Sequence, residues 1–179
     1  MTAIRSLTAH DAGLVQTLYG QTPDYFLNIS GRPAEPGSAR ENLTQFPPGI
    51  SGAPILLGAF EGSRLVGILI AVVGFPTAQT AHIGLLLVHP DSRARGVGRA
   101  LHEAYLARLD ERAGIRTLRL GIVGSNARLA EPFWRSLGYE DSGARKPFQL
   151  GAVTSEVRIF TRAPVRPNGC HRAGRPSEK

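Results

Sequence analysis

A short loop of arginines and glycines near the middle of the 179-residue chain contains residue types suited to holding an anion. Directly after the apolar run LLLV the chain places Arg93, Arg95, Gly96, Gly98 and Arg99. A helix-like pattern begins at the glycines, and the first N–H groups of a helix lack partners and carry positive potential. Glycines let an anion approach the main chain closely, and the arginines add positive charge. The spacing therefore predicts a site for an anion such as a pyrophosphate.

Two common phosphate-binding motifs do not fit this loop. A P-loop requires a lysine after its last glycine, and this segment has none. The dinucleotide fingerprint requires another glycine three residues after the second, and that position is Leu101. What remains is the pattern R-x-x-G-x-G, Arg93 to Gly98, placed between an apolar strand and an amphipathic helix.

The elements around the loop must hold it in place. The run AHIGLLLV, residues 81–88, predicts a strand, and apolar residues at helical spacing predict a helix over about 96–112. The run RTLRLGIV, residues 116–123, predicts the next strand. A strand–helix–strand unit of this kind predicts a parallel strand pair with a right-handed crossover.

Further elements surround this unit. Two apolar runs separated by EGS predict a β-hairpin before it, and a helix and an antiparallel strand pair follow it. Five prolines and four glycines between residues 21 and 52 predict an irregular segment with one short helix at 38–46. We call residues 21–52 the roof, because we expect them to cover the acceptor site. Together the elements predict an α/β (α+β) fold with one domain over residues 1–163. Residues 164–179 predict a disordered basic tail.

Two segments resemble the GNAT superfamily of N-acetyltransferases. LLVHPDSRARGVGRAL resembles its coenzyme-A-binding motif, and FWRSLGY, with the pattern Phe133-Trp134-x-x-Leu137-Gly138-Tyr139, resembles its second signature. The resemblance covers roughly residues 3–162. It implies a single GNAT-like domain whose mixed central sheet is splayed between two parallel strands and flanked by helices. It also implies acetyl-CoA as co-substrate, no metal, and transfer of the acetyl group to a primary amine by direct attack in a ternary complex.

The resemblance also implies which residues contact coenzyme A. The backbone of the strand end would pair with the pantetheine arm, the loop N–H groups would hold the pyrophosphate, and the second helix would flank the coenzyme. The implied coenzyme-binding residues are Leu86, Leu87, Val88, Arg93, Ala94, Arg95, Gly96, Val97, Gly98, Arg99, Asn126 and Phe133. Asn126 lies one residue farther from the aromatic position than the family spacing suggests, and Pro132 inside the helix should kink or loosen that turn.

Catalysis requires a base for the amine, and it benefits from an acid for the departing thiolate. His82 is the predicted base, because it lies on the strand beside the cleft, where some family members carry a histidine, and its ordinary pKa suits the task. Strand alternation predicts that it shares a face with Gly84 and Leu86 unless a bulge intervenes. Trp134 is the second catalytic candidate, because the resemblance places it beside the coenzyme, at the position where family members often have a tyrosine that serves as the acid. An indole N–H cannot donate a proton to a thiolate as a phenol can, so the acid is water, a nearby tyrosine, or absent.

Other titratable residues are weaker candidates. Asp24 and Glu41, from the roof, are alternative bases. His89 is predicted in a loop, and His102 on the exposed side of its helix.

The acceptor is predicted to be a small-molecule or peptide amine under the roof, where Tyr25, Phe26 and Phe46 could line its site. The formal net charge of +7 makes nucleic-acid binding an alternative function. The arginines are spread along the chain without interleaved aromatics, so we expect no nucleic-acid partner. A non-catalytic acyl-CoA-binding regulatory module is the main alternative function, and a homodimer is possible.

The sequence also bears on where the protein works. A single cysteine, Cys170, excludes an intrachain disulfide and a cysteine metal cluster. No apolar run is long enough to span a bilayer, and no signal peptide is recognisable, so we expect a cytoplasmic protein without a membrane partner.

Overall fold

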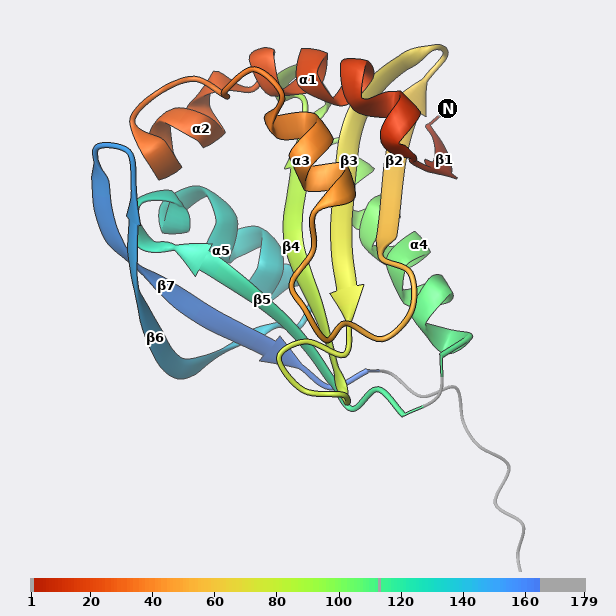
Figure 1. Ribbon diagram of the computed structural model, residues 1–179, viewed down its shortest axis with the longest axis vertical. Coiled ribbons are helices and arrows are strands. Elements are labelled where there is room, and N and C mark those ends of the chain that lie inside the picture. The colour runs from red at the N-terminus through yellow and green to blue at the C-terminus, as the bar shows by residue number, and fades with distance from the viewer. Residues whose placement is uncertain (1, 113, 165–179) are drawn as a thin grey trace, which may run out of the picture.

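The computed structural model describes residues 2–112 and 114–164, so the predicted tail beyond Pro164 and Cys170 lie outside the described residues. In this described part of the chain, seven strands form one sheet in the order β1-β2-β3-β4-β5-β7-β6 (Figure 1). Their bounds are Ala3–Ser6 for β1, Ile55–Glu61 for β2, Arg64–Val73 for β3, Thr80–Val88 for β4, Thr117–Val123 for β5, Glu140–Leu150 for β6 and Val153–Arg162 for β7. The one parallel pair between described strands is β4 with β5, and the others are antiparallel. The predicted mixed α/β fold is therefore confirmed.

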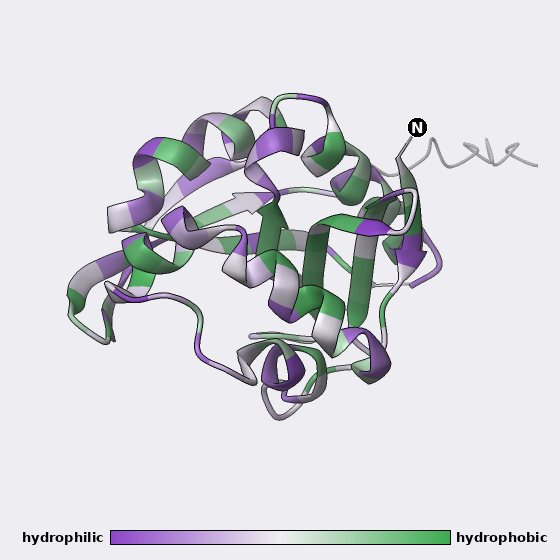
Figure 2. Cartoon of the chain, turned by 90° about the horizontal axis from the view of Figure 1, so that it is seen from above, coloured by the Kyte–Doolittle hydropathy of each residue, from purple (hydrophilic) through white to green (hydrophobic). Residues whose placement is uncertain are grey.

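Within the described residues, five α-helices cover the two faces of the sheet. They are α1 (Ala12–Gly20), α2 (Pro23–Ser30), α3 (Ser38–Thr44), α4 (Val97–Asp110) and α5 (Ala127–Ser136). In Figure 1 α3 lies in front of the strands β3 and β4, and α4 lies behind the sheet. Two clusters of buried apolar side chains follow from this arrangement. One packs α4 and α5 against the sheet, and the other packs α1, α2 and α3 against the opposite face. The strands between them are strongly hydrophobic (Figure 2).

The roof over residues 21–52 is more regular than the proline and glycine content indicates. Besides the expected short helix α3, it contains the helix α2, which the sequence analysis did not predict. Pro23 occupies the first turn of α2, where its missing N–H costs nothing. Gly31 ends the helix in the left-handed conformation, with φ of 73°. The same residue types that indicate loops therefore mark the two ends of a helix here.

A bulge in β4 changes which side chains share a face. Leu85 pairs with Ile70, whereas the next pair on β3 joins Ile83 to Ala71, so Gly84 has no partner on β3. Leu85 and Leu87 pack on the α1–α3 side of the sheet, whereas Leu86 packs with the cluster of α4 and α5. The prediction that His82 shares a face with Leu86 was conditional on an unbroken strand, and the bulge removes that condition.

The sheet opens between β4 and β5. The parallel pairing joins Thr80–Ile83 to Thr117–Leu120 and ends there. Beyond it β5 continues to pair with β7, while β4 continues to pair with β3 as far as Val88. The two strands therefore separate toward their carboxyl ends, which confirms the predicted splay.

His102 is buried rather than exposed, so the prediction for this residue is wrong. Its side chain is 1% exposed. Its ring lies edge-on to those of Trp134 and Tyr139, at centroid distances of 6.2 and 5.6 Å. The physical reason is that α4 is covered on two sides, by the sheet and by the end of α5.

Candidate active site

A cavity of about 660 Å³ opens where the end of β4, the arginine–glycine loop and α5 meet. We call it the loop cavity. Eleven of the twelve predicted coenzyme residues line it: Leu86, Leu87, Val88, Arg93, Ala94, Gly96, Val97, Gly98, Arg99, Asn126 and Phe133. Arg95 does not, because its mostly exposed side chain points to Glu61, 3.7 Å away. The structure thus brings together residues that are up to 47 positions apart in the sequence (Leu86 to Phe133).

The backbone of the loop has the shape of an anion cradle. Ala94 and Gly96 both have positive φ, 57° and 83°, and Gly96 is the N-cap of α4 without a side-chain capping bond. The first N–H groups of the helix are therefore not satisfied by a cap. Gly98 is closely packed, since a Cβ added there would lie 3.1 Å from two ring atoms of Phe133. The loop thus fits the predicted pyrophosphate group.

Asp24, an alternative base in the sequence analysis, instead holds an arginine of the loop. Its carboxylate accepts two hydrogen bonds from the Arg93 guanidinium, the longer at 3.0 Å. Arg93 Nε also donates to the carbonyl of Val88 at 3.1 Å. The hydrogen bond to Arg93 lowers the pKa of Asp24, so the carboxylate is charged near neutral pH and is a poor proton acceptor. The pair connects α2 to the predicted coenzyme loop.

A second cavity of about 600 Å³ lies beneath α2 and α3, over β3 and β4. We call it the roof cavity. Tyr25, Phe26 and Phe46 line it, together with Phe75 from the β3–β4 connection. Glu41, another alternative base, also lines it and is exposed. The location agrees with the expected acceptor site.

A small cavity of about 80 Å³ occupies the opening between β4 and β5. We call it the gap cavity. It shares Leu86, Asn126 and Trp134 with the loop cavity, and Gly84 and Leu85 with the roof cavity. The gap cavity therefore lies between the other two and shares walls with both.

His82 lines the roof cavity and hydrogen-bonds to a cation. The guanidinium of Arg119, its partner on β5, donates to His82 Nδ1 at 2.9 Å. Burial, and next the charge of Arg119, lower the pKa of His82 to about 4. His82 is neutral at pH 7, and with Nδ1 accepting this bond its proton sits on Nε2. The role of His82 as base stays a prediction, and it requires the bond from Arg119 to open.

Trp134 lies on the wall that the loop and gap cavities share, and it is 7% exposed. Its ring packs edge-on against Phe133 and Tyr139, at 5.0 and 5.3 Å between centroids. α5 continues through Pro132 as one helix, and Asn126 precedes its first turn. Phe133 and Trp134 thus both lie in the wall of the loop cavity, and their contact with coenzyme stays a prediction.

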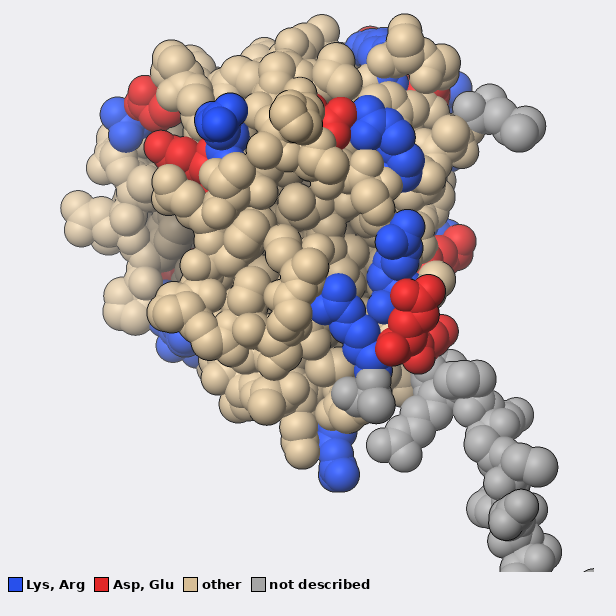
Figure 3. All heavy atoms as spheres, turned by 45° about the vertical axis from the view of Figure 1, so that its right-hand side comes forward, with Lys and Arg blue, Asp and Glu red and all other residues tan. Residues whose placement is uncertain are grey.

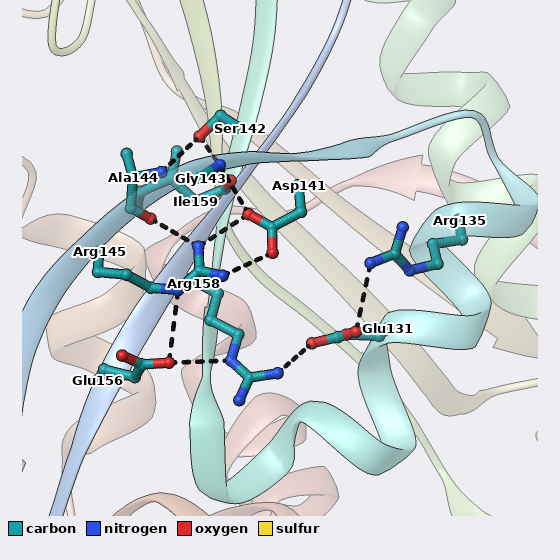
Figure 4. A network of polar contacts seen from close by, with 10 residues as sticks. All are labelled: Glu131, Arg135, Asp141, Ser142, Gly143, Ala144, Arg145, Glu156, Arg158 and Ile159. Atoms are coloured by element: carbon teal, nitrogen blue, oxygen red, sulfur yellow. Dashed lines mark hydrogen bonds and ion pairs between the residues drawn. The ribbon is translucent and has the colours of Figure 1, made fainter.

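A network of ion pairs fixes α5 against the last two strands (Figure 4). Arg158 on β7 donates to Glu131 of α5 at 2.8 Å and to Glu156 at 3.1 Å. Arg145 on β6 adds a pair with Asp141 at 2.7 Å. Exposed pairs contribute little singly, but here they share partners across three elements. They help to hold the wall of the loop cavity that α5 forms.

Charges on the surface are mixed. On the face shown in Figure 3, basic side chains of the described residues lie among acidic ones. Several arginines are paired in this way, including Arg5 with Asp11 at 2.7 Å and Arg32 with Glu35 at 3.0 Å.

A sequence model of the acetyltransferase (GNAT) family matches residues 21–139, which is more than half of the chain. The chain belongs to this family. Membership makes the protein an acyl-transferring enzyme, and GNAT acetyltransferases generally use acetyl-CoA as the acyl donor. No curated protein sequence matches the chain well enough to count as a relative.

Solved structures of acetyltransferases have the same fold as this GNAT protein. An acetyltransferase from Thermus thermophilus is 26% identical, with a TM-score of 0.70 over 91% of this chain and 97% of that one. The ribosomal-protein-S18-alanine N-acetyltransferase of Escherichia coli is 20% identical, with a TM-score of 0.67 over 94% and 97%. At that identity the second likeness shows the fold alone.

The described part of the chain has no helix that is long and apolar enough to cross a membrane. It also contains no cluster of three or more His, Cys, Asp or Glu side chains that could hold a metal ion.

Sequence reasoning missed several lining residues. Leu129 and Ser92 in the loop cavity, and Phe75 in the roof cavity, carry no local signal of their positions, whereas Ile29 in the roof cavity does. The Thr22-Pro23 start and Gly31 stop of α2 were a usable signal. With that helix assigned, Ile29 and Tyr25, four residues apart, fall on one face.

Proposed function

We propose that this protein is an acetyl-CoA-dependent N-acetyltransferase that transfers an acetyl group to a primary amine by direct attack within a ternary complex. The observation that carries the proposal is the gap cavity, which shares walls with the loop cavity on one side and the roof cavity on the other. A donor in the first and an amine in the second would meet where β4 and β5 separate.

The loop and the start of α4 bind the donor in this proposal. The N–H groups from Ala94 to Arg99 hold the pyrophosphate, and Arg93 and Arg99 neutralise part of its charge. The edge of β4 after Ile83, which β5 does not pair with, is open for hydrogen bonds to the pantetheine arm. Bound acetyl-CoA supplies an activated acetyl group.

Direct attack needs no protein nucleophile. None of the residues lining the three cavities is a cysteine, and Cys170 lies outside the described residues. The amine must lose a proton, because an ammonium has no lone pair. His82 is the proposed acceptor of that proton, once Arg119 releases its Nδ1.

The test is thiol release from acetyl-CoA across a panel of primary amines, with acetyl-CoA affinity measured calorimetrically on the same samples. Wild-type protein should turn over at least one amine, and His82→Ala should lose turnover at unchanged affinity. Arg119→Gln is the matched second variant: if His82 is the base, the acidic limb of kcat/KM moves to higher pH. Tight acetyl-CoA binding without turnover of any amine would favour a non-catalytic binding module instead.

A further inference from the structure

Tyr25, in the first turn of α2, lies where the three cavities meet. It lines the loop cavity, the roof cavity and the gap cavity, and no other described residue lines all three. A side chain in this position can touch a donor in the loop cavity and an acceptor in the roof cavity. Tyr25 therefore lies where the donor and the acceptor of the proposed ternary complex would meet.

The other tyrosines of the chain cannot take this position. The sequence has four tyrosines, and all four lie within the described residues. The hydroxyl of Tyr19 accepts from Asn42 at 2.9 Å, and that of Tyr139 lies 3.1 Å from His102 Nε2. The hydroxyl of Tyr105 is buried without a partner among the described residues. None of these three tyrosines lines any of the three cavities.

Two polar side chains of α2, one before and one after Tyr25 in the sequence, hold the helix at the cleft. Asp24 binds Arg93 of the loop before α4, as described above. One turn later, Asn28 Nδ2 donates to Asn126 Oδ1 at 3.2 Å, at the start of α5. The helix is thus tied to both walls of the predicted coenzyme site, and Tyr25 lies between its two ties. A side chain held in this way is preorganised for the reaction.

Resting on the proposed function, we propose that Tyr25 is a catalytic acid that protonates the departing coenzyme sulphur. The amine nitrogen forms a bond to the acetyl carbonyl carbon, and the carbon–sulphur bond breaks. The sulphur takes the electron pair of that bond and the proton of the Tyr25 hydroxyl. The proton that an ammonium sheds before the attack goes to His82. The neutral amine loses a further proton as it becomes the amide, and that proton returns through solvent to the Tyr25 oxygen, so that, counted from the neutral amine, no proton is gained or lost overall.

The Tyr25 hydroxyl has a proton to donate. Burial raises the pKa of Tyr25 to about 12, so the hydroxyl is protonated at neutral pH, and it gives up the proton only as negative charge develops on the sulphur. Trp134 occupies the wall of the same gap cavity, but an indole N–H does not give up its proton to a thiolate as a phenol does. A positioned acid of this kind typically contributes between about 10²- and 10⁴-fold to the rate.

The experiment compares wild type, Tyr25→Phe and the control Tyr105→Phe, which removes a buried hydroxyl that lines none of the three cavities. Turnover is measured with acetyl-CoA and an amine substrate, and affinity for acetyl-CoA by calorimetry. A second readout needs no turnover: the pKa of the thiol of bound coenzyme A is followed by thiolate absorbance, as a difference between bound and free coenzyme. If Tyr25 donates to sulphur, it stabilises the thiolate and lowers that thiol pKa.

We expect Tyr25→Phe to lower kcat by roughly 10²-fold at nearly unchanged acetyl-CoA affinity, and to raise the bound thiol pKa. Tyr105→Phe should change neither quantity. An unchanged kcat, or a bound thiol pKa equal to that of wild type, would overturn the assignment. If wild type turns over no amine, the proposed function fails, whereas the thiol titration still decides whether Tyr25 donates to the sulphur.

Discussion

Acidic conditions should destabilise this protein through His102, which is buried between α4 and α5. Burial, followed by the charges of Arg162 and Arg99, lowers the pKa of His102 to about 4 from an ordinary value of 6.5. Between these two values the unfolded chain binds one proton more than the folded chain. The stabilising contribution is therefore complete above pH 6.5 and is lost as the pH falls toward 4.

The size of the effect follows from the width of that window. Each pH unit between the two pKa values costs about 1.4 kcal/mol of unfolding free energy. Lowering the pH from about 7.5 to about 5 crosses roughly one and a half units of the window, which gives a loss of about 2 kcal/mol from this residue. The side chain is only 1% exposed, so solvent screening reduces this value little.

The assay is urea unfolding of wild type and His102→Gln at both pH values. The glutamine variant is expected to be less stable at either pH, because it loses packing against Trp134 and Tyr139. The informative quantity is the difference between the two pH values, which should be about 2 kcal/mol smaller in the variant. The titration of His82 contributes equally to the pH dependence of both proteins, so it cancels when the two are compared. Equal pH dependence in the two proteins would refute the argument that His102 is held neutral by burial.

Three further perturbations test the site and the core. Gly98→Ala should weaken acetyl-CoA binding roughly tenfold by calorimetry, since the added Cβ displaces the Phe133 ring at a cost of about 1–2 kcal/mol; unchanged affinity would show that the ring has room to move. Asp24→Asn should change unfolding free energy by less than about 1 kcal/mol, because the pair with Arg93 is exposed. At low salt the same variant should bind acetyl-CoA several-fold more tightly, because it removes a negative charge beside the site proposed for the pyrophosphate. This gain should disappear at high salt, because salt screens the charge. Tyr105→Phe should raise the free energy of unfolding by about 1 kcal/mol, because it removes an unsatisfied buried hydroxyl; a lower value would indicate an internal hydrogen bond to water.

The features predicted correctly depend on local patterns. The hairpin of β2 and β3, the unit from β4 to β5 and the loop at Gly96 each have apolar periodicity or glycines within a short window. Once the parallel pair of β4 and β5 forms, the end of β4 and the loop at Gly96 come together in the loop cavity. For these parts the sequence was sufficient, since each element specifies its own geometry and the crossover is right-handed.

The features that were missed depend on distant contacts. Asp24 and Arg93 are 69 positions apart, and nothing near either residue indicates the pair. His102 follows Leu101 on α4, and only the packing of α5 decides that a second face of this helix is covered. The bulge at Gly84 is a property of the paired strands, and one strand read alone cannot reveal it.

α2 is a wall common to both proposed substrate sites, with Tyr25 facing both and Asp24 bound to Arg93. Any acceptor that displaces this helix would also move Arg93, which faces the donor. Binding at one site would therefore change the binding free energy at the other. Thermodynamic linkage makes that term reciprocal: the factor by which an acceptor changes donor affinity equals the factor by which the donor changes acceptor affinity. A bulky amine would therefore reveal itself by its effect on acetyl-CoA binding, even when it is too poorly placed to react.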